Sequence, residues 1–544
     1  MFMEVPMAPD NPDPEKWQNP APHPIIYVRG YAMTRGEIDS TTADPFCGFN
    51  IGSTIFRATA DRKQPPRKFM FESPVLRLSK DFGYGDVFLD GADLTELPPA
   101  DQGIRRRSIV IHRYYDSSSS LLGDGQTKPI TEFAEKLSEL IRRVQELTAT
   151  GDDHVDEKDF RCYLVAHSMG GLVCRAFLQN AKCDKSDTKK YVDKFFTYAT
   201  PHNGIDMAGL NVPTWLTADD IDNFNRKNMA DYLALSEQKF YQDQQEKRVD
   251  WISEKDFPSR RIFCLVGSNR MDYETAMGLS RTFAGHGSDG LVRIENAIVC
   301  SSDGDADAHP TAKAFVYRSH SGYFGIVNSE EGFQNLTRFL FGDLRIDIWL
   351  DIETLRLPAA VVADARGKPV DALYQIEVLA SARGKPWYLT RRVAEEDSVA
   401  CLRHQDWVDN PDKKGKLHLS TAFLSAKFKT DKTDRTLSYI VTVGVKVPDY
   451  EVDGAFWTKH HYEGSYLFHG SVIVSVTPPL GDQGWQVKYD WQTDTVHEPS
   501  TQVEPEAGED GSSIVRIKLP PRPEDVTPAV TGQLRFVISE WNRK

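Results

Sequence analysis

The sequence predicts two folded parts in succession, an α/β part built on a mostly parallel sheet and then an antiparallel β-sandwich. Before about residue 345, short continuous apolar runs alternate with helical periodicity, as in sheets covered on both faces. After it, apolar and polar residues alternate along short segments, as in strands with one face on a core. A chain of 544 residues is also too long for a single hydrophobic core.

The composition is that of a globular protein, with 40% hydrophobic and 26% charged residues. The formal net charge of −14 argues against nucleic acid as a partner. The seven cysteines show no metal-ligand spacing, which favours reduced thiols. No apolar run has the length of a membrane span, and the first residues lack the basic and apolar regions of a Sec signal. We therefore expect a cytoplasmic protein, or one exported by a route that needs no signal peptide.

Six apolar runs are expected to form the parallel sheet, joined by right-handed crossovers, with ligands at the C-terminal ends of the strands. Between residues 130 and 147, apolar residues recur at steps of three and four, which predicts an amphipathic helix that Gly151 ends. The six runs cover residues 25–28, 108–113, 162–165, 192–200, 261–267 and 314–317.

Three other segments of the first part are expected to lie outside the sheet. Residues 1–22 are rich in proline and polar residues and predict an irregular arm. Residues 31–107 have no clean periodicity and are too long for a plain connection, so we expect a loop insertion over the functional face. Residues 205–250 mix apolar clusters with charged helix formers and are a candidate lid, the alternative being a surface insertion without a catalytic role.

The residues around Ser168 combine a buried strand, a sharp turn and a helix, in the order C-Y-L-V, A-H-S-M-G-G and L-V-C-R-A-F-L. Small residues such as Ala166 and Gly170 allow the strand and the helix to pass closely. The pattern resembles the nucleophile elbow of the α/β-hydrolase superfamily, in the A-x-S-x-G variant of some bacterial lipases. Ala166 departs from the usual first glycine by one methyl group. The alternative is a serine that only caps the helix.

Two later motifs extend the resemblance, which covers roughly residues 23–340. The stretch S-D-G-L-V around Asp289 is similar to the acid loop of bacterial lipases. His320 directly follows the last strand, where the superfamily carries its base, and a T-P-H-N-G turn at residues 200–204 is a further similarity. The resemblance implies a catalytic triad of Ser168, Asp289 and His320, in the chain order of the superfamily. The rival acids are Asp272, Asp303 and Asp305.

The resemblance also implies an oxyanion hole formed by two backbone N–H groups. The N–H group of Met169 directly follows the nucleophile. The N–H group of Tyr31 follows Gly30, where related hydrolases carry His-Gly and a bulky residue, although Arg29 replaces the histidine here. No metal or organic cofactor is implied.

The remaining histidines and acids predict no metal site. The acidic loop at residues 303–309 lacks the trailing glycine and the distal glutamate of an EF-hand. His286 and the pair His460 and His461 have no partners at metal-ligand spacing, so we expect polar surface there. We expect a structural role for His167.

Residues 345–544 are expected to form the β-sandwich domain, after a catalytic α/β-hydrolase domain at residues 23–344. Alternating patterns such as Tyr439, Val441 and Val443 support this expectation. Some lipases carry a C-terminal β-sandwich that engages lipid or a protein partner, but this comparison concerns architecture alone.

The resemblance as a whole implies a serine hydrolase of carboxylic esters, with lipid or long-acyl esters as substrates and a lipid surface as a contact. Three other functions remain open. The same site could transfer the acyl group to an alcohol, or the chain could be a phospholipase toxin exported without a signal peptide. A non-catalytic binding module on a hydrolase scaffold is the third. The sequence does not indicate an oligomeric state.

Overall fold

The structure is a computed structural model of the chain. It describes residues 22–30, 53–57, 67–71, 74–87, 103–114, 128–205, 224–245, 247–272, 287–302, 310–322, 325–429, 434–453, 459–479, 483–492, 500–508, 511–521, 523 and 526–542.

A sheet of seven parallel strands forms the centre of the first part, in the order β11-β9-β7-β6-β1-β5-β4. The six predicted apolar runs are all strands of this sheet, and the short strand β4 adds a seventh. The strands are β1 (Ile25–Val28), β4 (Gly85–Asp86), β5 (Ser108–His112), β6 (Cys162–His167), β7 (Val192–Tyr198), β9 (Ile262–Gly267) and β11 (Ala312–Val316).

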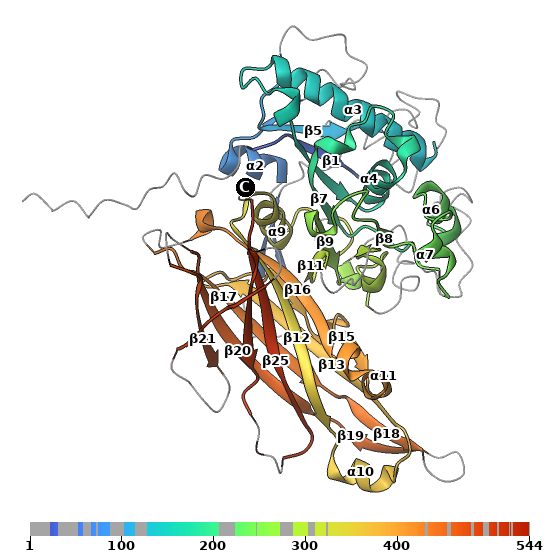
Figure 1. Cartoon of the computed structure of the whole chain (residues 1–544), viewed down its shortest axis with the longest axis vertical. Helices are drawn as coiled ribbons and strands as arrows, with labels where there is room; N and C mark the ends of the chain where they lie inside the picture. Colours follow the sequence, from blue (N-terminus) through green and yellow to red (C-terminus); the bar gives the residue numbers. More distant parts are fainter. Residues whose placement is uncertain are drawn as a thin grey trace, which may run out of the picture.

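Helices cover both faces of this sheet (Figure 1). Successive residues of a strand point to opposite faces, so β1 contributes Ile26 and Val28 to one core and Ile25 and Tyr27 to the other. The first core includes α3 (Ile130–Thr150) and α4 (Met169–Gln179), and the second includes α2 (Pro74–Phe82) and α9 (Glu330–Phe341). Burial on both faces explains why the strands are continuous apolar runs.

The segment at 31–107 is more regular than the expected loop insertion. Where the structure describes it, it forms the hairpin β2 (Ser53–Arg57) and β3 (Arg67–Phe71), then α2 and β4. Helix α2 packs against α9, and Arg77 forms a 2.9 Å ion pair with Glu330. The expectation of irregular structure is therefore wrong for α2, whose buried Val75 and Leu78 are too few to give a clear helical period.

The predicted antiparallel β-sandwich is confirmed in the second part, where two sheets pack their apolar faces into one core. The smaller sheet has the order β16-β12-β25-β24-β23, and the larger has the order β19-β18-β13-β17-β20-β21-β22, with β14 and β15 also paired to β13. The smaller sheet contains β12 (Leu344–Arg356), β16 (Lys416–Leu424), β23 (Glu506–Ala507), β24 (Ser513–Lys518) and β25 (Ala529–Glu540). The larger contains β13 (Val370–Ala382), β14 (Thr390–Arg392), β15 (Ala400–Arg403), β17 (Leu437–Lys446), β18 (Asp449–Asp453), β19 (Lys459–Glu463), β20 (Tyr466–Thr477), β21 (Gln486–Gln492) and β22 (Thr501–Val503).

Several short elements complete the described chain. They are α6 (Arg226–Tyr232), α7 (Lys239–Gln242), β8 (Trp251–Ile252), β10 (Cys300–Ser301), α10 (Ala359–Ala365), α11 (His404–Asp409) and α12 (Pro411–Lys414). Among the helices that the structure describes, none is long and apolar enough to cross a membrane.

The two parts share a buried junction at α9, β11 and β16, which lie side by side in Figure 1. Phe423 of β16 and Trp541, which directly follows β25, belong to the same apolar cluster as Phe339 of α9. Strand β12 is consequently buried on both faces over its first half, including Trp349. The alternating residues Ile346, Ile348 and Leu350 lie in the sandwich core as expected, and the second face of β12 is buried as well, where Arg345 bonds to carbonyl oxygens of the first part.

Candidate active site

Ser168 occupies a sharp turn between β6 and α4, as its sequence pattern predicts. Its backbone has φ 54° and ψ −130°, a positive φ that is rare for a residue other than glycine. The N–H group of Ser168 donates to the carbonyl oxygen of Tyr198 at the end of β7, at 2.9 Å. Strained residues of this kind are concentrated at functional sites, where the surrounding structure must hold them.

Three glycines make this turn possible by removing atoms from places where chains pass closely. A Cβ atom at Gly170 would clash with the carbonyl oxygen of Val28, and one at Gly171 would clash with the side chain of Thr200. A Cβ atom at Gly30 would clash with Ser168 itself. The chain that leaves β1 therefore passes directly beside the Ser168 side chain.

The structure brings Ser168, His320 and Asp289 into one hydrogen-bonded series. The Nε2 atom of His320 lies 2.9 Å from Ser168 Oγ, and its Nδ1 atom lies 2.9 Å from Asp289 Oδ2. All three side chains are buried. This is the arrangement in which an imidazole can take a proton from a serine while a carboxylate fixes its orientation.

Backbone N–H groups hold the second oxygen of the Asp289 carboxylate. Asp289 Oδ1 accepts from the N–H groups of Leu291 and Val292, at 3.0 and 2.8 Å. The S-D-G-L-V motif thus supplies both the carboxylate and the turn that orients it. The carbonyl oxygen of Asp289 also accepts from the N–H group of His320 at 3.0 Å, which fixes the two loops against each other.

His167 supports His320 from the other side. Its Nε2 atom donates to the carbonyl oxygen of His320 at 2.8 Å, and the two rings lie 5.0 Å apart. Burial, and then the nearby His320, hold the pKa of His167 well below its usual value. A neutral ring with its proton on Nε2 can make this bond. His167 therefore holds the backbone of His320 in place.

The two expected oxyanion donors differ in how far the structure describes them. Met169 is the first residue of α4, so its N–H group has no acceptor within the helix and lies at the positive end of the helix dipole. Tyr31 lies outside the described residues. Gly30, which precedes Tyr31, lies beside the Ser168 side chain.

Arg175 is a structural residue of the site that sequence reasoning missed. It lies on α4 with an exposed fraction of 0%, and its guanidinium donates to the carbonyl oxygens of His202, Val249 and Trp251. Burial lowers the pKa of Arg175 to about 10, so it stays charged at neutral pH. These bonds tie the T-P-H-N-G turn to the helix that follows Ser168. An arginine inside the apolar run L-V-C-R-A-F-L was the available signal.

The other predicted site segments are described only in part. Asp272 lies in the short helix η7 (Arg270–Asp272), whereas the carboxylate bonded to His320 belongs to Asp289. Asp303, Asp305, the rest of the acidic loop and His286 lie outside the described residues, as does most of the first half of the candidate lid.

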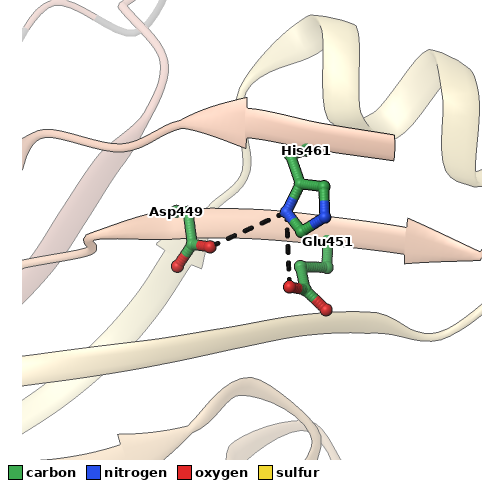
Figure 2. A group of neighbouring side chains, drawn as sticks. All are labelled: Asp449, Glu451 and His461. Carbon is green, nitrogen blue, oxygen red and sulfur yellow. Dashed lines mark ion pairs between the residues drawn. The ribbon is translucent and has the colours of Figure 1, made fainter. Parts of the chain in front are cut away.

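One group of potential metal ligands appears away from this site, although no metal site was predicted there. Paired strands β18 and β19 bring Asp449, Glu451 and His461 together, as Figure 2 shows. His461 Nδ1 lies 3.3 Å from Glu451 and 3.9 Å from Asp449. The His461 side chain is 59% exposed, and Glu451 is already paired with Lys459. The group is therefore interpreted as a surface ion-pair cluster. Sequence spacing missed it because the residues come from two strands.

A model of the PGAP1-like alpha/beta domain family matches residues 124–245, which include α3, β6, Ser168, α4 and β7. Among curated proteins, none matches the chain significantly.

Several solved structures are similar to the chain at low identity. Phospholipase PlaB from Legionella pneumophila is 14% identical, with a TM-score of 0.30, over 81% of this chain and 89% of that one. Aspergillus fumigatus lipase B is 12% identical, with a TM-score of 0.28, over 60% of this chain and 54% of that one. The lin2722 gene product of Listeria innocua is 14% identical, with a TM-score of 0.23, over 59% and 94% respectively. Similarity at this level carries no information about the substrate.

The parallel sheet, the strained serine turn between β6 and α4, and the family match over this region agree with one another. The first part of the chain has an α/β-hydrolase fold, and the region around Ser168 is similar to the PGAP1-like alpha/beta domain family.

Proposed function

We propose that the protein is a serine hydrolase that cleaves carboxylic esters, with Ser168 as nucleophile, His320 as base and Asp289 as the acid that orients His320. The observation that carries this proposal is the continuous hydrogen-bonded series from Asp289 through His320 to the hydroxyl of Ser168. A serine that only caps a helix needs neither an imidazole at 2.9 Å nor a carboxylate behind it.

In the proposed reaction, Ser168 Oγ attacks the acyl carbonyl and transfers its proton to His320 Nε2. Asp289 holds the Nδ1–H tautomer and stabilises the imidazolium that forms. The backbone N–H groups of Met169 and Tyr31 are the proposed donors to the tetrahedral oxyanion. His320 then returns the proton to the leaving alcohol, and water activated by the same imidazole releases the acid from the acyl-enzyme.

Lipid or long-acyl esters are the proposed substrates. The two longest connections of the first part, after β1 and after the turn that follows β7, both leave the sheet at the edge where Ser168 lies. Chain at this edge can cover an apolar acyl group and exclude water from the reaction. A lipid surface is the proposed contact, and transfer of the acyl group to an alcohol stays the alternative reaction.

The test combines active-site labelling with a substrate series on the purified full chain. A fluorophosphonate probe should label Ser168, and turnover of nitrophenyl esters should be greatest for the longer acyl chains. Ser168→Ala should abolish labelling and lower turnover by at least about 10³-fold. Ser268→Ala is the matched control, because Ser268 is buried at the end of β9 and donates to the carbonyl oxygen of Val316. Labelling of another serine in Ser168→Ala, with turnover retained, would contradict the proposal.

A further inference from the structure

A cavity of about 190 Å³ lies where helix α9 meets the β-sandwich. Its lining comes from α9, the end of β13 and the turn after it, the end of β16 and the chain after it, and the start of β17. The lining includes four cationic side chains and one carboxylate, namely Arg338, Arg383, Lys385, Lys429 and Asp434.

Arg338 is the deepest of these cations, and it has no carboxylate partner among the residues that the structure describes. It is only 2% exposed, and its Nε atom donates to Gln334 at 3.2 Å. The guanidinium lies against Trp387 and Phe428, with 5.4 and 4.7 Å to the ring centroids. Its two terminal amino groups donate to no acceptor within the described ranges, and Arg338 is one of the residues that line the cavity.

An unpaired buried charge is costly, so this arrangement requires an explanation. Burial lowers the pKa of Arg338 to about 10, which leaves the side chain protonated at neutral pH. Aromatic faces compensate a guanidinium in part, but they leave its in-plane N–H donors free. An arginine held against two rings in the lining of a cavity, with donors left unbonded, is preorganised to bind a planar pair of acceptor oxygens.

The rest of the lining adds charge and a hydroxyl group. Arg383 and Lys385 follow the end of β13, and no described side chain pairs with either of them. Lys429 donates to the carbonyl oxygen of Asp434, which leaves its charge in place. Ser425, 4% exposed, also lines the cavity, and within the described ranges its hydroxyl has no hydrogen-bond partner.

We propose that this cavity is a binding site for a phosphate group, with Arg338 as its central ligand and Arg383, Lys385 and Ser425 around it. A phosphate dianion offers two oxygens to the guanidinium and further oxygens to the lysine and the hydroxyl. At about 190 Å³ the cavity has room for a phosphate group with a small substituent. The source is a soluble phosphate ester or the head group of a phospholipid, which share this chemistry. The proposal does not depend on the catalytic role of Ser168.

The first experiment measures thermal unfolding of the full chain during titration with inorganic phosphate, at constant ionic strength maintained with chloride. Phosphate should raise the melting temperature of the wild type in a saturable manner. Arg338→Met should abolish this increase. In phosphate-free buffer the variant should be at least as stable as the wild type, because it removes an unpaired buried charge. Arg403→Gln is the control, since Arg403 is exposed on β15, where it pairs with the distant start of β13.

A second variant keeps the test decisive if Arg338→Met fails to fold. The double change Arg383→Gln and Lys385→Gln alters only the rim and should weaken phosphate binding about 3- to 10-fold by calorimetry. An equal melting shift in the wild type and in Arg338→Met, an equal shift with chloride, or unchanged affinity in the double variant would overturn the proposal.

Two further arms distinguish the source of the phosphate group. Glycerol 3-phosphate should compete with inorganic phosphate if a soluble ester is the ligand. Vesicles of phosphatidylcholine with phosphatidic acid should bind the wild type more strongly than Arg338→Met if the ligand is a lipid head group. Binding in neither arm would overturn the assignment to a phosphate ester.

Discussion

Two hydrogen-bonded groups of buried side chains, one in each part of the chain, differ in how they end. In the first part, the series from Asp289 through His320 ends at the hydroxyl of Ser168, which within the described ranges is bonded to His320 alone. At the junction, Arg345 and Asp347 of β12 form a group that closes on itself. Nε of Arg345 donates to Asp347 at 2.9 Å, and a second guanidinium nitrogen donates to the other carboxylate oxygen at 3.1 Å.

Other bonds of the junction group run to neighbouring segments. Arg345 donates to the carbonyl oxygens of Arg260 and Pro310, at 2.8 and 2.6 Å, and Thr421 donates to Asp347 at 2.6 Å. Arg260 and Pro310 belong to the first part, so this group fastens β12 to the edge of the parallel sheet.

The difference indicates what each group can do. A series that ends at a serine hydroxyl has a proton to give and an imidazole to receive it, whereas the ion pair at the junction has no such donor and acceptor. Arg345 and Arg338 repeat the contrast. Both are buried arginines near the junction, but all three nitrogens of the Arg345 guanidinium donate to acceptors in the protein, whereas among the described residues Arg338 donates only through Nε, to Gln334. Burial of a charged side chain therefore does not by itself identify a binding site. The distinguishing feature is the presence of N–H donors without an acceptor among the residues that the structure describes.

The largest expected effect comes from breaking the first series at its acid. Asp289→Asn should lower turnover by about 10²- to 10⁴-fold, because the imidazole then loses the partner that fixes its tautomer and stabilises its charge. Substrate binding should change much less. Turnover and KM of a nitrophenyl ester measure this, with circular dichroism as a check on folding.

Asp272→Asn is the matched control for this prediction, because Asp272 is the described rival acid on the same edge of the sheet. It should retain most of the activity. A deep loss of turnover in Asp272→Asn, with Asp289→Asn nearly active, would assign the orienting role to Asp272.

The second prediction concerns the junction group of Arg345 and Asp347. Arg345→Met leaves the buried Asp347 without its cation, so the free energy of unfolding should fall by about 3–5 kcal/mol in urea titrations. Arg535→Met is the control. Arg535 of β25 pairs with Asp351 of β12 at 2.9 Å, nearer to solvent than the junction group, so the expected loss is about 1 kcal/mol. Similar losses of unfolding free energy in both variants would show that the junction group contributes no more to stability than an ordinary ion pair.

The sequence was sufficient where the structure is local. The parallel strands are continuous apolar runs, and the turn around Ser168 needs small residues within a few positions, so both could be predicted. His320 was expected near Ser168 from the resemblance to lipases, and its Nε2 atom lies 2.9 Å from Ser168 Oγ, while its catalytic role stays a prediction. The junction could not be predicted, because the alternation along β12 does not reveal that the first part covers its second face.

Groups assembled from distant segments could not be predicted either, because the sequence pattern does not show which segments meet. The Arg338 cavity joins a helix to three strands of the second part, and the carbonyl oxygens to which Arg175 donates lie 27 to 76 positions away. A lone arginine in an apolar helix indicates that a partner exists, but does not say which one. Tyr31, proposed as an oxyanion donor, lies outside the described residues and stays a prediction.

The smallest expected effect concerns the pH dependence of the free energy of unfolding, to which a residue outside both groups should contribute. His23 belongs to neither group and packs edge-on against Tyr163, with ring centroids 5.2 Å apart. Burial lowers its pKa from 6.5 to about 4. Between these values the unfolded chain binds a proton at His23 that the folded chain does not, so stability rises with pH and is lost as pH falls.

Replacing the His23 ring by phenylalanine keeps the packing and removes this proton. His23→Phe should therefore lose about 1–2 kcal/mol less than the wild type between pH 7 and pH 5 in urea titrations. Parallel stability curves for His23→Phe and the wild type would show that this ring takes up its proton equally in both states.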